Sequence, residues 1–293
     1  MGLERAREEA FRFLKQNLGR YIRLLKDLVA VPSVSARGEG VEECARLVEE
    51  LLAERGFRTR IVRASGHPAV LAEREAGEKD ILIYNHYDVQ PPEPLEGWEG
   101  RNPFELSEEG ELLIGRGVAD NKGNIAARLA AIDALLHALG ELPLTVKFIV
   151  EGEEEIGSPS LPGIVREHAS FLRASGGIWE TAYLGRRGEL RIPLGFKGML
   201  YLELKVRGPS RDVHSGYSPL VPNPIWRLVR LACLLKDERD RILVPGLQDV
   251  VADLGYDAEA LLAQVPFDEE AMKRDLGLEE FVGGLTGPEA LRQ

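Results

Sequence analysis

Apolar residues recur at helical spacing near the N-terminus of the chain. Spacings of three and four residues place successive side chains on one face of a helix. Pro32 stops the first run, and Gly56 follows a second run over 41–55. The apolar positions of the first run are Leu14, Leu18, Ile22, Leu25 and Leu28. The pattern therefore predicts two amphipathic helices before the first strand.

Short apolar runs alternate with helical patterns through the middle of the chain. "RTRIV", "PAVLAE" and "DILIYNHY" predict three strands, and "LTVKFIV" predicts a fourth after a helix over 121–139. A further helix is predicted over 159–173. Strands that alternate with helices are typical of a largely parallel sheet covered on both faces. The sequence thus predicts a three-layer α/β/α domain with a mostly parallel sheet over residues 1–197.

The pattern changes after Gly198. "MLYLELKVRG" alternates apolar and polar residues, as a half-buried strand does, and "NPIWRLVRLACLLKD" has the spacing of an amphipathic helix. Residues 249–293 contain acidic helical pieces without a further strand pattern. We therefore expect residues 198–293 to form the first part of a second, smaller α+β domain.

Composition and charge narrow the possible partners. The 293 residues carry a formal net charge of −11, which repels nucleic-acid backbones and anionic membrane surfaces. No run of 18 apolar residues occurs, and the N-terminus resembles an amphipathic helix rather than a signal peptide. The two cysteines, Cys44 and Cys233, are expected to pack in the core of a reduced protein. We expect a cytoplasmic protein without nucleic-acid or membrane partners.

Polar residues gather where predicted strands end. "NHYDVQ" ends one strand and "EGEEEIGS" ends another, and ligands of α/β sheets bind at the carboxyl ends of strands. The second stretch holds Glu151, Glu153, Glu154 and Glu155, whose charges repel one another unless a cation lies among them. Of the adjacent pair, one carboxylate can coordinate a metal while its neighbour takes a proton from water.

Two other stretches offer candidate ligands. His86 and Asp88 flank one residue, so both side chains leave the same face of a strand, although an isolated pair of this kind is usually a surface turn. Asp120 lies among glycines before a helix, where it either caps the helix or bridges two cations. The spacing of a phosphate-binding loop is absent there. Glu180, which follows Trp179, is a candidate ligand only together with these residues.

In this order and spacing, "NHYDVQP", "GRGVADNKG", "EGEEEIGS", "WE" and "RDVHSG" resemble the dinuclear zinc peptidases and deacylases. That superfamily includes carnosinase-type dipeptidases, glutamate carboxypeptidase, acetylornithine deacetylase, succinyl-diaminopimelate desuccinylase and aminoacylase. The sequences of the motifs "HYDVQP" and "EGEEE" are most similar to those of the dipeptidase branch. The resemblance extends over essentially the whole chain.

The resemblance implies a role for each matching residue. His86, Asp120 and Glu180 would bind one divalent metal ion, and Asp120 would bridge it to a second ion bound by Glu155. Asp88 would orient His86, Glu154 would be the general base, and a cis peptide bond would join Asp120 to Asn121. The small domain would form a homodimer, and His214 would reach into the partner subunit to stabilise the oxyanion. Zinc is the expected metal, with manganese or cobalt as alternatives.

The sequence also departs from the resemblance. No histidine follows His214, so the ion at Asp120 and Glu155 lacks a third protein ligand. Members of this superfamily are longer, and their final strands and last histidine have no counterpart here. The chain is either an N-terminal piece of a longer protein or a natural short form.

The favoured interpretation is a hydrolase that cleaves the C–N amide bond of small peptides or N-acyl amino acids with metal-activated water and a glutamate base. The alternative is a catalytically silent relative that keeps the fold and forms dimers or holds substrate. A third possibility is a single-metal enzyme that uses His86, Asp120 and Glu180. The sequence does not distinguish a dipeptide from an N-acyl amino acid as substrate.

Overall fold

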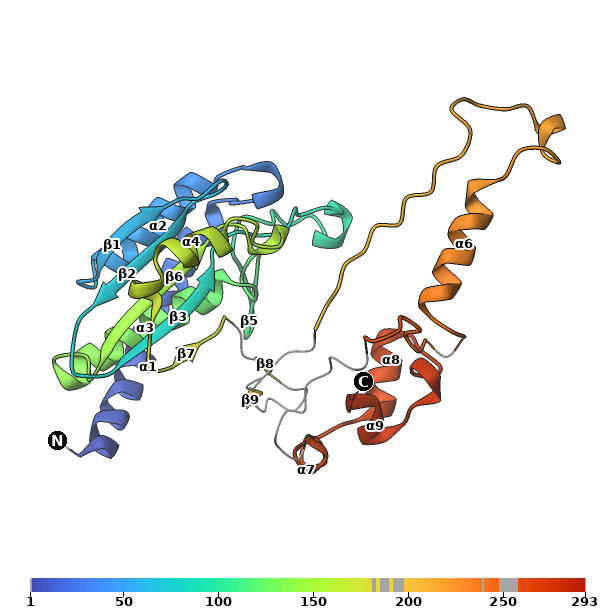
Figure 1. The fold of residues 1–293 in the computed structure, drawn as a ribbon. Helices are drawn as coiled ribbons and strands as arrows, with labels where there is room; N and C mark the ends of the chain where they lie inside the picture. Colours follow the sequence, from blue (N-terminus) through green and yellow to red (C-terminus); the bar gives the residue numbers. More distant parts are fainter. Residues whose placement is uncertain are drawn as a thin grey trace. The chain divides into compact units, whose positions relative to one another are not determined.

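The computed structural model describes residues 2–180, 183–184, 190–191, 198–238, 240–247 and 258–292. The chain divides into two compact units, Met1–Phe196 and Lys197–Gln293, which are considered separately. The long helices of the first unit are α1 (Leu3–Ala30), α2 (Val41–Ala53) and α3 (Lys122–Leu139) (Figure 1). Within the described residues, no helix is long and apolar enough to cross a membrane.

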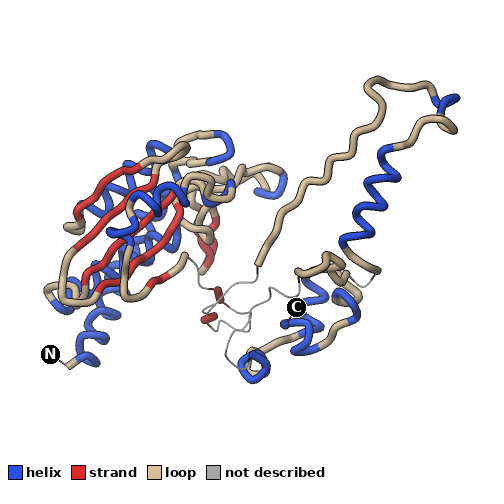
Figure 2. The backbone as a smooth tube through the Cα atoms, in the orientation of Figure 1, coloured by secondary structure: helices blue, strands red, loops and turns tan. Residues whose placement is uncertain are grey.

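The centre of the first unit is a sheet of five strands, counted over the described residues, in the order β1-β2-β6-β3-β7. Figure 2 draws the strands in red. β3 runs parallel to β6 and β7, whereas β2 runs antiparallel to β1 and β6. Four of the five strands therefore point the same way, and the predicted, mostly parallel sheet is confirmed. The strands are β1 (Arg58–Val62), β2 (Ala69–Arg74), β3 (Asp80–His86), β6 (Thr145–Glu151) and β7 (Gly177–Ile178).

Helices cover both faces of this sheet. Alternate strand residues contribute to two separate apolar clusters, because successive side chains of a strand point to opposite faces. Val70, Ile83 and Phe148 pack in the cluster that contains α1, α2 and α3. Leu71 and Tyr84 pack in the other cluster, with Ile164 and the residues around α4 (Leu161–Glu167) and α5 (Ala169–Leu172). The three-layer prediction is confirmed, although the helix predicted over 159–173 is divided at His168.

The register of the sheet brings the two polar stretches together. His86, the last residue of β3, pairs with Glu151, the last residue of β6. Because these neighbouring strands are parallel, the loops that follow them leave the same edge of the sheet. Two small pairs of strands complete the unit: β4 (Ser107–Glu109) with β5 (Leu112–Ile114), and β8 (Tyr183–Leu184) with β9 (Leu190–Arg191).

The second unit is helical in its described residues. The helix predicted from "NPIWRLVRLACLLKD" forms as α6 (Pro224–Leu235), which begins where the Asn223 side chain accepts the backbone N–H of Ile225. The shorter helices are α7 (Ala258–Leu262), α8 (Glu269–Leu276) and α9 (Gly287–Arg292).

Two predictions for the second unit are wrong. No strand forms over 198–208, where Met199 is 94% and Tyr201 87% exposed. A strand needs a partner for its backbone N–H and C=O groups, and this segment pairs with no other within the described part of the unit. Cys233 is exposed rather than packed in a core, since nothing described covers that face of α6, whereas Cys44 is buried as predicted.

Candidate metal and active site

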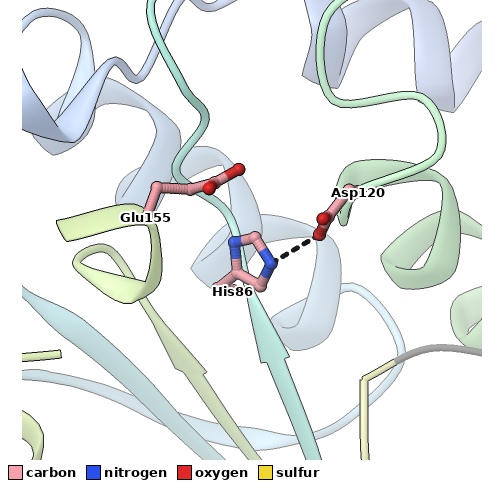
Figure 3. A group of neighbouring side chains, drawn as sticks. All are labelled: His86, Asp120 and Glu155. Carbon is pink, nitrogen blue, oxygen red and sulfur yellow. Dashed lines mark hydrogen bonds and ion pairs between the residues drawn. The ribbon is translucent and has the colours of Figure 1, made fainter. Parts of the chain in front are cut away.

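A buried histidine is the centre of the site. His86 is 0% exposed at the end of β3, and its ring faces the carboxylate of Asp120. The His86 Nε2 atom lies 2.8 Å from Asp120 Oδ1 and 3.3 Å from Glu180 Oε2. Figure 3 shows the ring beneath Asp120 and Glu155, which come from loops on either side. Three segments far apart in sequence thus bring ligand atoms to one point.

Asp120 lies in a tight turn before α3. A cis peptide bond joins it to Asn121, as the resemblance implied. A Cβ atom on Gly123 would approach the Val118 carbonyl oxygen to 2.0 Å, so only glycine fits where the helix starts against this loop. The N-cap of α3 is Asn121. The Asp120 carboxylate does not cap the helix, and it lies against His86 instead.

Asp88 connects the histidine to the acidic loop. Its Oδ1 atom lies 3.4 Å from His86 Nδ1 and accepts the backbone N–H of Glu154 at 3.2 Å. Its Oδ2 atom accepts the backbone N–H of Glu155 at 3.1 Å. The Asp88 carbonyl oxygen also lies 3.2 Å from His86 Nδ1, so Asp88 contacts the ring through its backbone and its carboxylate, and holds the loop through the carboxylate.

The acidic run after β6 separates into two pairs. Glu151 is buried and accepts the hydroxyls of Tyr84 at 2.7 Å and Ser158 at 2.8 Å. Glu153 is also buried and accepts backbone N–H groups at both of its oxygens. These two carboxylates hold the loop, a role that the sequence analysis missed because each has a partner in a distant segment, Tyr84 or His67.

The other pair turns toward His86. Glu154 Oε2 lies 3.9 Å from His86 Nε2. Glu155 offers an oxygen in a group with His86 and Asp120 whose ligand atoms all lie within 4.8 Å of one another. Gln90 donates its side-chain N–H to Glu155 Oε2 at 3.0 Å and to the Glu155 carbonyl at 2.9 Å. Gln90 is a site residue that sequence reasoning did not single out.

The electrostatics of the site favour a cation. Burial lowers the pKa of His86, but hydrogen bonds to Asp120 and Asp88 and the charges of both outweigh it and raise the pKa to about 11. Burial and mutual repulsion raise the pKa values of Glu154, Glu155 and Glu180. An imidazole that retains its proton so strongly lies in a field of excess negative charge, where a divalent ion would also be stabilised.

The donor set fits a divalent metal ion. Imidazole nitrogens and carboxylate oxygens are among the ligands that zinc takes in proteins. Glu180 Oε2 is buried and accepts no hydrogen bond from the described residues. A buried carboxylate oxygen without a donor is costly, and a cation beside His86 would satisfy it.

His214 belongs to the second unit. Its Nδ1 atom accepts the backbone N–H of Gly216 at 3.1 Å, where the short 3₁₀ helix Ser215–Tyr217 begins. The side chain is exposed. Its predicted role toward a partner subunit stays a prediction.

The sequence profile of peptidase family M20/M25/M40 matches residues 82–256, which include every predicted site residue. The chain belongs to this family. A crystal structure of an M20 family metallo-carboxypeptidase from Sulfolobus solfataricus superposes with a TM-score of 0.82 at 34% identity, covering 92% of this chain and 62% of that one. The family assignment therefore rests on sequence and fold together.

Curated M20 relatives include two kinds of dipeptidase. The Cys-Gly metallodipeptidase dug1 of Schizosaccharomyces pombe is 32% identical over 217 residues, which cover 72% of this chain and 45% of the relative. The Beta-Ala-His dipeptidase of Homo sapiens is 28% identical over 306 residues, which cover 94% of this chain and 58% of the relative. The chain thus spans about half the length of the curated relatives it matches.

Proposed function

We propose that this M20 chain carries the catalytic centre of a metal-dependent hydrolase that cleaves the C–N amide bond of small peptides. The observation that supports it best is the arrangement of Asp120 and Glu180 around the Nε2 atom of His86, with Glu154 beside them. Residues 1–197 would be the catalytic domain, and residues 198–293 the first part of a lid and dimerisation domain.

The residues would hold two divalent metal ions, for which we propose zinc. His86, Asp120 and Glu180 would bind one ion, and Asp120 and Glu155 would bind the other. When bound, such ions polarise a carbonyl group and make water easier to deprotonate. The buried Glu180 Oε2, which accepts no hydrogen bond from the described residues, supports this assignment of the first ion.

Glu154 is the proposed general base. Burial raises the pKa of its carboxyl group, with further contributions from the charges of Glu155, Asp120 and Asp88, and this makes the carboxylate a stronger base. Glu154 would accept the proton of the water that attacks the carbonyl carbon and pass it to the leaving amine nitrogen. Asp88 holds the Glu154 backbone for this task.

For the substrate we propose a dipeptide. The matched relatives are described as acting on Cys-Gly and on beta-Ala-His. An N-acyl amino acid is the alternative, because a succinyl-diaminopimelate desuccinylase of Erythrobacter litoralis is 31% identical over 224 residues. His214 of a neighbouring copy in a homodimer would stabilise the oxyanion.

A second candidate is a catalytically silent M20 relative. It differs from the first candidate at the ion beside Glu155, for which the proposal names two protein ligands, Asp120 and Glu155. Such a chain would keep the fold and the His86 site but show no turnover.

Substitution of Glu154 tests the proposal. The full chain would be assayed with Cys-Gly and beta-Ala-His, with and without added zinc or manganese. Glu154→Gln should lower kcat by roughly 10²–10⁴-fold with metal content unchanged. Glu111→Gln, on the exposed turn between β4 and β5, is the control.

Three other results would change the assignment. Loss of metal in Glu154→Gln would make Glu154 a ligand rather than the base. Full activity in that variant would refute the base assignment. A wild-type chain that binds metal but hydrolyses neither peptide would favour the silent relative.

A further inference from the structure

Arg128 of α3 connects two segments that both lead to the site. Its Nη1 group donates to the Tyr84 carbonyl oxygen of β3 at 2.9 Å. Its Nη2 group donates to the Glu180 carbonyl oxygen at 2.7 Å and also to that of Trp179. One guanidinium group therefore links the strand that ends in His86 to the segment that carries Glu180.

The Glu180 segment has few other attachments. β7 pairs with β3 over two residues, and Glu180 lies beyond the end of the strand. Ile178 is 45% and Trp179 55% exposed, so neither side chain is buried in the apolar core. Trp179 stacks on the Tyr84 ring with 4.1 Å between ring centroids, and Asn121 donates to the Glu180 carbonyl oxygen at 3.3 Å. Among the described residues, Arg128 therefore makes two of the three side-chain hydrogen bonds to the carbonyl oxygens of Trp179 and Glu180.

The chemistry of Arg128 suits this task. It forms no ion pair with a carboxylate in the described part of the chain, and the charge is stabilised by three backbone carbonyl oxygens instead. Hydrogen bonds from a charged donor are roughly twice as strong as neutral ones. A planar, forked donor group fixes direction as well as distance. A lysine at this position could not reproduce the pattern.

We propose that Arg128 is a positioning residue for Glu180: by fixing the backbone of 179–180 against β3, it holds the Glu180 carboxylate beside the His86 ring. The inference rests on the proposed function, because Glu180 is a metal ligand only there. It predicts that loss of the guanidinium group weakens metal binding only because Glu180 is no longer held in place.

The first test is independent of metal. Hydrogen–deuterium exchange of metal-free protein would compare wild type with Arg128→Met. Exchange should become faster in residues 177–180 and stay unchanged in β1. The matched control is Arg74→Met: Arg74 is a half-buried arginine that also donates to a backbone carbonyl, but it pairs with Val146 near the start of β6, the end of that strand away from Glu151. Unchanged exchange at 177–180 in Arg128→Met would overturn the proposal.

The second test is a double-mutant cycle on zinc affinity, measured by calorimetry. Arg128→Met should weaken binding by about 10-fold or more, the usual effect of losing a group that orients a ligand. In a Glu180→Gln background the same change should cost less than about twofold, because the ligand it positions is already lost. Arg128→Lys should be intermediate, and it replaces the methionine variant if that variant does not fold.

Two results of the cycle would overturn the proposal: zinc affinity within twofold of wild type in both Arg128 variants, or an equal loss with and without Glu180. A wild-type chain that binds no zinc would instead refute the proposed function. In that case the exchange experiment alone would show whether Arg128 holds residues 177–180 in place.

Discussion

The Asp88 carboxylate accepts the backbone N–H of Glu155 across 67 residues of sequence, at 3.1 Å. The same side chain accepts the N–H of Glu154 and lies against the His86 ring. Asp88 is fully buried, so these bonds are not replaced by water. The end of β3 and the loop after β6 are thereby held as one unit around the histidine.

Replacing Asp88 should therefore disturb both parts of the site. An asparagine keeps one acceptor oxygen but presents an amide N–H₂ to the second backbone N–H. We expect Asp88→Asn to lower the free energy of unfolding by about 1–3 kcal/mol and zinc affinity by about 10-fold or more. Urea unfolding and calorimetry would measure the two effects. Asp27→Asn, an exposed position on α1, is the control, and unchanged zinc affinity in Asp88→Asn would refute the role.

Replacing Gln90 should weaken the binding of only one of the two proposed ions. Its side chain donates to both the carbonyl and the carboxylate of Glu155. Methionine has a similar length but no N–H group, so Gln90→Met leaves the Glu155 carboxylate without this donor. We expect the affinity for the second ion to fall a few-fold while the ion at His86 binds as before. A stepwise zinc titration separates the two, and an equal loss at both would contradict the assignment.

Asp80, at the start of β3 and away from the site, should make the stability of the fold depend on pH. Asp80 accepts hydrogen bonds from Lys147 Nζ and from the N–H and O–H of Ser175, and these lower its pKa from 3.8 to about 2. A carboxyl group whose pKa is lower in the folded state stabilises that state above its unfolded pKa, and the effect is lost as the pH falls through the folded value. Wild type should thus be more stable than Asp80→Asn above about pH 4, and the difference should shrink as the pH falls through about 2.

Denaturant unfolding at a series of pH values measures this difference. Glu78→Gln, a nearby exposed residue, should show no such convergence with wild type. A stability difference between wild type and Asp80→Asn that persists unchanged to about pH 2 would contradict the role of the charged form.

The sequence predicted the central sheet because its helices bury one face each and its strands are short apolar runs. The runs in "DILIYNHY" and "LTVKFIV" are visible locally, and parallel strands bring their carboxyl ends to one edge. His86 and the loop of Glu154 and Glu155 could therefore be placed together from sequence. The same reasoning failed for 198–208, because an alternating pattern does not show whether a partner strand exists.

Roles that depend on distant partners were not predictable. Glu151 and Glu153 have the same local pattern as Glu154 and Glu155, yet their carboxylates bond to Tyr84, Ser158 and the backbone of His67 and Ser160. Arg128 looks like any polar residue of α3 until Tyr84 and Glu180 are placed beside it. Side-chain direction and long-range contacts decide these roles, and the spacing of residues along the sequence shows neither.

Zinc titration of metal-free wild type against His86→Ala tests the central claim most directly. His168→Ala, a partly exposed histidine of the same unit, is the control, and circular dichroism would verify the fold of each variant. The account predicts at least one tightly bound ion per chain in wild type and in His168→Ala, and its loss in a folded His86→Ala. Wild type without stoichiometric zinc, or binding unchanged in His86→Ala, would contradict it.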